Sequence, residues 1–174
     1  EEGKSNLFPF SKNLQGKILD FFFNEPKREL RVFTDDGDAI ITTLTDRSSN
    51  NEKTFSFHYN CISASICHRD VLFITSDYKA KLATFKEIKG EIDGEIKEEF
   101  PSIVKPVRFC LLTSQLIALA DSSLLYIRKC SVSSSSDVEW KTHKFRDFYV
   151  KNLISVNRQM EFGLMTNHNT RICY

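Results

Sequence analysis

Apolar and polar residues alternate along most of the chain, in short runs that small polar turns separate. One phrase recurs four times: a β-rich run, a polar turn and a second β-rich run. Its copies cover residues 30–44 (LRVFTDDGDAIITTL), 71–85 (VLFITSDYKAKLATF), 116–130 (LIALADSSLLYIRKC) and 162–174 (FGLMTNHNTRICY). Alternation with a period of two is typical of half-buried strands and excludes helical repeats of similar length. An all-β chain is therefore predicted.

Each phrase supplies two strands of a larger unit. The turns carry Asp, Gly, Ser or Asn, which suit tight hairpins, at residues 36–37, 76–77, 121–123 and 167–169. A further strand precedes each phrase, at residues 17–23, 61–68, 107–112 and 152–156, and another follows three of them, at residues 54–59, 96–104 and 138–145. Three units of four strands and a fourth unit of three strands result.

The period of the unit indicates its architecture. The phrases repeat about every 41 to 46 residues, close to the roughly 40–45 residues of a β-propeller blade with four antiparallel strands. Residues 1–174 are predicted to form a single partial propeller domain, with blades at 17–59, 61–104, 107–145 and 150–174. Because an open array leaves faces that need neighbours, we expect it to be part of a larger, seven-bladed ring.

The first residues leave one alternative open. A closed propeller hides its edges by completing its last blade with a strand from the other end of the chain. Ser5–Phe10 is a candidate for such a strand, and Pro9 would restrict it to an outer edge. Residues 1–14 are thus predicted to be either flexible or a closing edge strand.

Three segments between strands are predicted to be surface loops, and they are candidates for contact with partners, with plain solvent-exposed loops as the alternative. The preferred one is residues 86–99 (KEIKGEIDGEIKEE), which is acidic, contains two glycines and is expected to form a solvated loop or a short frayed helix. The other two are residues 46–53 and the serine-rich residues 131–136.

The four phrases resemble WD40 repeats, in which a strand, a turn centred on Asp and a third strand ending in Trp-Asp recur. No unit here ends in Trp-Asp, and Trp140 lies on a different strand. The second unit is the most similar, and the resemblance implies that His58, Thr75 and Asp77 form the family's structural hydrogen-bond relay. Ala83 stands where that relay has its tryptophan.

Composition narrows the classes of function. The net charge is +1, from 24 basic and 23 acidic residues, so no overall field attracts nucleic acid or a membrane surface. The five cysteines are scattered and odd in number, which indicates a reducing compartment. No signal segment or apolar run of about 20 residues is present. A soluble, intracellular protein of the nucleus or cytoplasm is expected.

No motif predicts catalysis, a cofactor or a metal. His58, Cys61, Cys67 and His68 form the one cluster of candidate metal ligands, but a strand over residues 61–68 would turn His68 away from the two thiols. No nucleophile elbow or glycine-rich phosphate loop occurs, and Asp35, Asp36 and Asp38 lack the spacing of a calcium-binding loop. A small-molecule substrate is not expected.

Two functions remain. The first is a non-catalytic protein–protein interaction scaffold, a subunit of an intracellular complex whose partners include other subunits and the chain that completes the propeller. The alternative is a non-catalytic RNA-binding subunit in tRNA or rRNA processing or modification, beside a catalytic partner. Its candidate contacts, which the scaffold would also use, are Arg128, Lys129, Lys141, Lys144, Arg146 and Lys151.

Overall fold

The computed structural model describes residues 16–44, 51–100, 107–130, 140–146, 149–155, 162–166 and 170–173. The predicted segment 1–14 therefore lies outside the described residues, as do residues 46–50 of the predicted loop at 46–53 and all of the loop at 131–136. Residues 51–53 form part of a strand, so the prediction of a loop is wrong for them, because they pair with the strand before them. Within the described ranges, the chain forms antiparallel strands and one short 3-10 helix, η1 (Glu25–Lys27). No helix among these residues is long and apolar enough to span a membrane.

The strands form four sheets that follow one another along the chain. The first sheet contains β1 (Ile18–Asn24), β2 (Glu29–Thr34), β3 (Asp38–Thr43) and β4 (Asn51–Ser56). The second contains β5 (Cys61–Cys67), β6 (Asp70–Thr75), β7 (Ala80–Ile88) and β8 (Glu91–Phe100).

The third and fourth sheets repeat this arrangement. The third contains β9 (Phe109–Leu112), β10 (Leu116–Ala120), β11 (Leu124–Lys129) and β12 (Lys141–Lys144), and the fourth contains β13 (Val150–Ser155), β14 (Phe162–Thr166) and β15 (Thr170–Cys173). In every sheet the strands are hydrogen-bonded in chain order. The predicted all-β array of three four-stranded units and a three-stranded fourth is confirmed.

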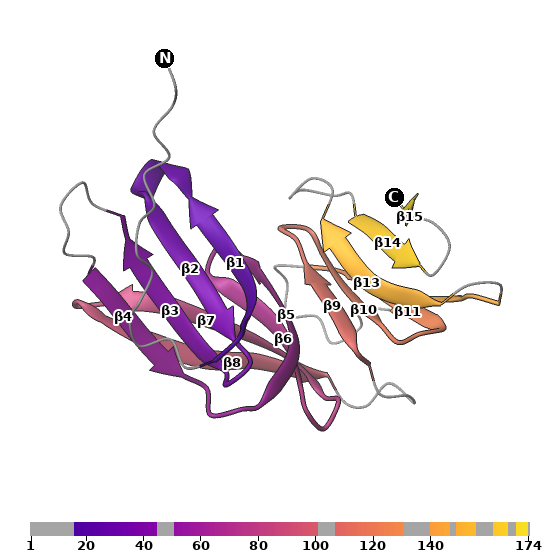
Figure 1. Ribbon diagram of the computed structural model, residues 1–174, viewed down its shortest axis with the longest axis horizontal. Coiled ribbons are helices and arrows are strands. Elements are labelled where there is room, and N and C mark those ends of the chain that lie inside the picture. The colour runs from indigo at the N-terminus through magenta and orange to yellow at the C-terminus, as the bar shows by residue number, and fades with distance from the viewer. Residues whose placement is uncertain are drawn as a thin grey trace, which may run out of the picture.

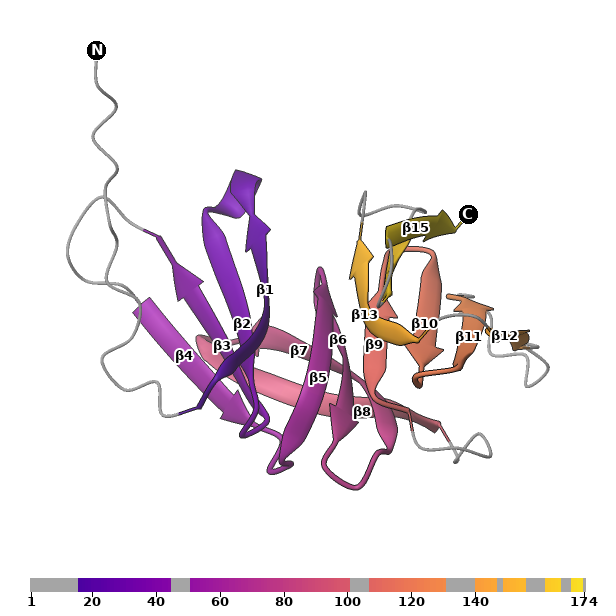
Figure 2. The ribbon, with the colours of Figure 1, turned by 45° about the vertical axis from the view of Figure 1, so that its right-hand side comes forward.

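The sheets pack face to face, with their first strands side by side. Figures 1 and 2 show the four sheets in succession, with β1, β5, β9 and β13 adjacent along the inside. These inner strands contact one another in that order. An array in which each sheet packs on the next and the first strand is innermost is the arrangement of propeller blades.

The hydrophobic core is divided among three joints between successive sheets. Aromatic residues dominate the first joint, where the Phe33 and Phe73 rings stack at 5.1 Å between centroids. The second joint contains aliphatic side chains such as Leu72, Ile74 and Leu119, and the third includes Leu153 of the fourth sheet. The central strands β6 and β10 are buried on both faces, which explains their unbroken apolar runs.

The prediction of a loop or helix over residues 86–99 is wrong. β7 and β8 form a long hairpin there, with Lys86 paired with Asp93 and Ile88 paired with Glu91. The hairpin extends beyond β6 and packs on β4 of the first sheet. Gly94 of the hairpin lies so close to the Phe55 ring of β4 that any larger side chain would clash with it. Glu87 of the hairpin pairs with Lys53 of β4 at 2.5 Å. Contacts with a distant strand thus outweigh the low strand propensity of the glycines and acidic residues.

Candidate functional site

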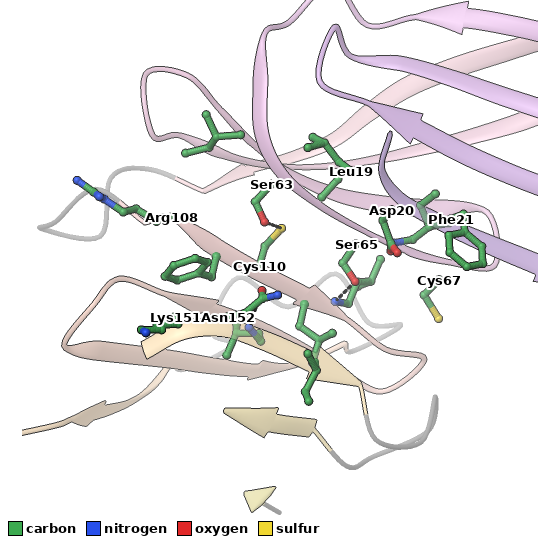
Figure 3. A pocket seen from close by; sticks show the side chains of 18 residues that line it. Leu19, Asp20, Phe21, Ser63, Ser65, Cys67, Arg108, Cys110, Lys151 and Asn152 are labelled. Atoms are coloured by element: carbon green, nitrogen blue, oxygen red, sulfur yellow. Dashed lines mark hydrogen bonds between the residues drawn. The ribbon is translucent and has the colours of Figure 1, made fainter. Parts of the chain in front are cut away.

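The inner strands line a cavity of about 670 Å³. Figure 3 shows side chains of β1, β5, β9 and β13 around it, with Arg108 and Lys151 toward one end of β9 and β13. The wall combines apolar groups with hydroxyl, carboxylate and amide groups, and nearly all of them come from these four strands.

Side chains of one inner strand accept hydrogen bonds from the backbone of the next. The Ile66 N–H of β5 donates to Asp20 Oδ2 of β1 at 2.7 Å, and the Leu112 N–H of β9 donates to Ser65 Oγ of β5 at 3.0 Å. Neighbouring inner strands belong to different sheets, so these bonds tie one blade to the next at the cavity wall. The polar groups of the wall therefore join the blades together.

Two thiols near the cavity, those of Cys61 and Cys110, are not activated nucleophiles. Burial raises the pKa of the Cys110 thiol from 9.0 to about 12, and burial, with the nearby Asp35 and Asp36, does the same for Cys61. A thiol reacts as its thiolate, so both groups are unreactive near neutral pH. Across the described parts of the chain, no three His, Cys, Asp or Glu side chains lie together as metal ligands.

The structure brings together two members of the predicted relay. In the β6–β7 turn, Thr75 Oγ1 donates to Asp77 Oδ1, and Asp77 Oδ2 pairs with Lys79 Nζ at 2.8 Å. These contacts lower the pKa of Asp77, with Lys79 as the largest cause and Thr75 the next. His58 lies in the expected connection before β5, but its side chain is exposed and bonds to neither residue. A complete relay does not form in this geometry.

The same turn presents an exposed aromatic ring. Tyr78 has a φ of 63°, a left-handed conformation that is uncommon for a bulky residue. The turn is held by the Tyr78 N–H, which donates to the Thr75 carbonyl at 2.8 Å, and by the Thr75 N–H, which donates to the Lys79 carbonyl at 2.9 Å. The Lys79 N–H also donates to Thr75 Oγ1 at 3.3 Å. Arg108 of the next sheet lies over the Tyr78 ring, with its Cζ 5.5 Å from the ring centroid.

This end of the array continues from the second sheet to the fourth. The Val150 N–H, at the start of β13, donates to the Ser122 carbonyl in the β10–β11 turn at 2.9 Å. Its neighbours Tyr149 and Lys151 are exposed. We call the exposed residues Tyr78, Lys79, Arg108, Tyr149 and Lys151 the turn-end rim. Lys151 was predicted as a contact residue, and Tyr149 is an aromatic residue of the same basic segment. Tyr78, Lys79 and Arg108 were not predicted, although Tyr78 directly follows the predicted turn at residues 76–77.

Arg128 lies between two sheets. Its guanidinium donates two hydrogen bonds to Glu98 of β8, at 2.7 and 2.6 Å, and lies 4.9 Å from the Phe100 ring centroid and 5.1 Å from that of Trp140. The Arg128 side chain is 14% exposed. The structure thus places this candidate contact residue in a joint between the second and third blades.

The other candidate contacts are exposed but do not form one surface. Lys144 pairs with Leu124 and Lys141 with Ile127, at opposite ends and on opposite faces of β12. Lys129 ends β11 at the same end as Lys141, whereas Arg146 follows β12 at the other end. Of the six residues, Lys144, Arg146 and Lys151 therefore share the end of the array that carries the rim.

Comparisons with known proteins identify the fold. No protein family profile matches the sequence, and no curated protein resembles it in sequence. The structure resembles the β-propeller domain of Cps50 (Swd1) from Myceliophteria thermophila, with a TM-score of 0.63 and 8% identity over 91% of this chain and 54% of that one.

Two further solved structures are similar to this chain. Human WBSCR16 has a TM-score of 0.55 and 11% identity over 90% of this chain and 47% of that one. PorZ, a component of the type-IX secretion system of Porphyromonas gingivalis, has a TM-score of 0.52 and 12% identity over 90% of this chain and 19% of that one. The chain thus spans about half the length of the first two structures. Its fold is an array of β-propeller blades, as its repeats predicted.

Proposed function

We propose that this chain is a non-catalytic scaffold that binds protein partners through the turn-end rim. The observation that carries this function is the grouping of exposed tyrosines with cationic side chains at one end of three successive blades. Tyr and Arg are enriched among the residues that dominate binding energy at protein interfaces. A single rigid array presents them in fixed relative positions.

The turn that carries Tyr78 supports this function. A left-handed backbone costs an ordinary residue on the order of 1 kcal/mol, and bonds of Thr75 maintain it here. The exposed Tyr78 ring is thereby carried on a fixed backbone. A preorganised aromatic anchor loses little conformational freedom on binding, which favours affinity.

The charges of the rim indicate the chemistry of the partner. Lys79 and the exposed Asp77 of the same turn pair with each other, so the net positive charge of the rim comes from Arg108 and Lys151. A protein surface with exposed carboxylates would complement this end of the array. We therefore assign the rim to an acidic protein partner within a complex.

Co-purification of the native protein with rim variants tests this function. Tyr78→Ala and Tyr149→Ala are each expected to lower partner recovery at least about 10-fold, as for hot-spot residues that contribute 1.4 kcal/mol or more. Ile88→Ala is the matched control, because Ile88 is similarly exposed but lies at the tip of the β7–β8 hairpin. Equal recovery with the rim variants and the control would refute the rim as the binding site.

RNA binding remains the alternative because Lys144, Arg146 and Lys151 share the rim end with Tyr149. Phosphate contacts release counterions, so RNA binding falls steeply as salt rises. A nuclease-resistant protein complex that survives high salt supports the scaffold. RNA that co-purifies, is lost with salt and depends on these three cations would replace the scaffold with the RNA-binding function.

A further inference from the structure

Three of the four inner strands contain a β-bulge at the same place. The strand pairing skips Leu19 in β1, Ile62 in β5 and Lys151 in β13. In each strand, the residue before the bulge pairs with the threonine that ends the second strand of the blade. The three bulge residues therefore occupy equivalent positions, at the end of the blades that carries the turn-end rim.

The bulges give the first two blades an apolar wall at this end of the cavity. All three bulge residues line the cavity of the inner strands. A bulge re-aims a side chain relative to regular alternation, and bulges are frequent beside functional sites. Ile62 is 41% exposed although it is a large aliphatic residue. An exposed aliphatic side chain in a concave cavity, beside the half-buried Leu19, favours contact with an apolar group of a partner.

The third and fourth blades give the same end of the cavity a positive charge. Lys151 is the bulge residue of β13, and Arg108 directly precedes β9; both are exposed and line the cavity. Among the described residues, neither side chain forms an ion pair. Asp20 supplies the one carboxylate of the described lining, and its Oδ2 accepts the Ile66 N–H. The two cations can therefore bind a carboxylate from outside.

Other polar groups of the wall are bonded within the wall itself. Ser63 Oγ lies 3.5 Å from Cys110 Sγ, and Asn152 Oδ1 accepts the Leu153 N–H at 2.9 Å. A small-molecule site usually fixes its ligand through a few convergent polar groups, whereas here these groups bond to neighbouring strands or backbone. The ligand that fits is an apolar group with a carboxylate beside it, and a polypeptide segment supplies both.

We propose that the cavity receives a segment of the acidic protein partner. An apolar side chain of this segment packs against Leu19 and Ile62, and a carboxylate within three residues of it pairs with Arg108 and Lys151. This proposal rests on the scaffold function, because it states how the partner at the rim is recognised. Arg108 and Lys151 belong to the rim and also line one end of the cavity (Figure 3), so a partner bound at the rim lies beside this opening.

Matched substitutions in the native protein test the apolar contact. Ile62→Asp and Ile88→Asp introduce the same charge at two isoleucines that are each 41% exposed, but Ile88 lies on the β7–β8 hairpin. Ile62→Asp is expected to lower partner recovery at least about 10-fold, as for a hot-spot residue, and Ile88→Asp to leave it unchanged. Equal circular dichroism melts of the two variants would show that both fold.

A second pair of substitutions tests the ionic contact. Lys151→Glu should lower partner recovery, whereas Lys151→Arg should retain it because the charge is kept. Lys141→Glu is the control, since Lys141 is exposed on β12 at the opposite end from the rim. Losses that are equal for Lys151→Glu and Lys141→Glu would reflect net charge alone and would overturn the ionic contact.

Photo-crosslinking in cells identifies the segment. A benzophenone amino acid replaces Ile62 or, as the control, Ile88. We expect a higher cross-link yield from position 62, and mass spectrometry should place the cross-link on another protein, with Asp or Glu within three residues of the linked site. A cross-link to residues 1–174, to RNA or to a segment without acidic residues would overturn the proposal, as would equal yields at the two positions.

The outcomes separate this inference from the scaffold function. If Tyr78→Ala lowers partner recovery but Ile62→Asp does not, the partner binds at the rim without entering the cavity, and this inference alone is refuted. If neither substitution changes recovery, the rim and the cavity are both excluded as binding sites. Loss of recovery with both substitutions, together with the acidic cross-linked segment, supports insertion into the cavity.

Discussion

Replacing Arg128 by alanine provides the sharpest test of the joint between the second and third blades. The change removes two charge-assisted hydrogen bonds to Glu98 and the contacts with the Phe100 and Trp140 rings. Glu98 is 40% exposed, so water can hydrate its carboxylate once the arginine is gone. Loss of the ion pair should therefore lower the free energy of unfolding by about 1–2 kcal/mol, less than when a fully buried charge loses its partner.

The ring contacts add to this cost. A cation over an aromatic ring contributes about 0.5–1 kcal/mol at exposed sites and more when desolvated. With two rings, the total destabilisation expected for Arg128→Ala is about 2–4 kcal/mol. An exposed arginine that served only an RNA partner would change the stability by less than about 0.5 kcal/mol, so the two roles predict clearly different results.

Urea unfolding followed by circular dichroism measures this difference in the free energy of unfolding. Lys141→Ala is the matched control, because Lys141 is a cation on the adjacent strand β12 and is exposed. The stability of Arg128→Lys should lie between those of the native protein and Arg128→Ala, because lysine retains the charge but lacks the planar guanidinium that donates two parallel hydrogen bonds. A double-mutant cycle with Glu98→Gln should give a coupling energy of about 1 kcal/mol or more. A destabilisation by Arg128→Ala no larger than that of Lys141→Ala would refute the structural role.

Three further predictions follow from buried groups. Phe33→Ala should cost about 3–5 kcal/mol in urea unfolding, because Phe33 is fully buried and stacked in the first joint; a cost below about 1 kcal/mol would contradict that packing. Gly37→Ala should lower the melting temperature more than Gly90→Ala. Both glycines have a positive φ, but a Cβ on Gly37 would lie 2.5 Å from the Tyr59 carbonyl oxygen, whereas the space around Gly90 is open. For Cys110, the folded-state pKa of about 12 exceeds the ordinary 9.0, so the unfolded thiol loses its proton first and stability should fall as pH rises above about 9. Cys110→Ala should reduce that slope, and native Cys110 should resist alkylation at pH 8; rapid labelling would count against its burial.

The order and type of the strands were predictable because local signals agreed with the fold. Period-two alternation placed the sheets, and residues such as Gly37, at a φ of 78°, occupy the predicted turns. The outer part of the β7–β8 hairpin, predicted as a loop or helix, was missed because its apolar residues are few and its partner, Phe55, lies about 40 residues earlier in the sequence. Even so, Ile92, Gly94 and Ile96 keep the spacing of two that marks one face of a strand.

The candidate binding residues were less predictable, for a physical reason. In the sequence, Arg128 has the pattern of a surface cation in a basic segment. Only the approach of Glu98 from another blade shows that its side chain is largely enclosed. Tyr78 and Arg108 come from different units of the repeat and meet only because adjacent sheets align their ends. Sequence patterns report on neighbours within a strand, whereas these contacts depend on how separate sheets are placed.

The crossing of the β7–β8 hairpin over β4 has a consequence for how the molecule unfolds. Blades that touched only through their flat faces would be able to open one at a time, as repeats in a linear array do. Here the Lys53–Glu87 pair and the close approach of Gly94 to Phe55 fasten the outer strand of the first blade to the second. The first two blades should therefore exchange their amide hydrogens as one cooperative unit.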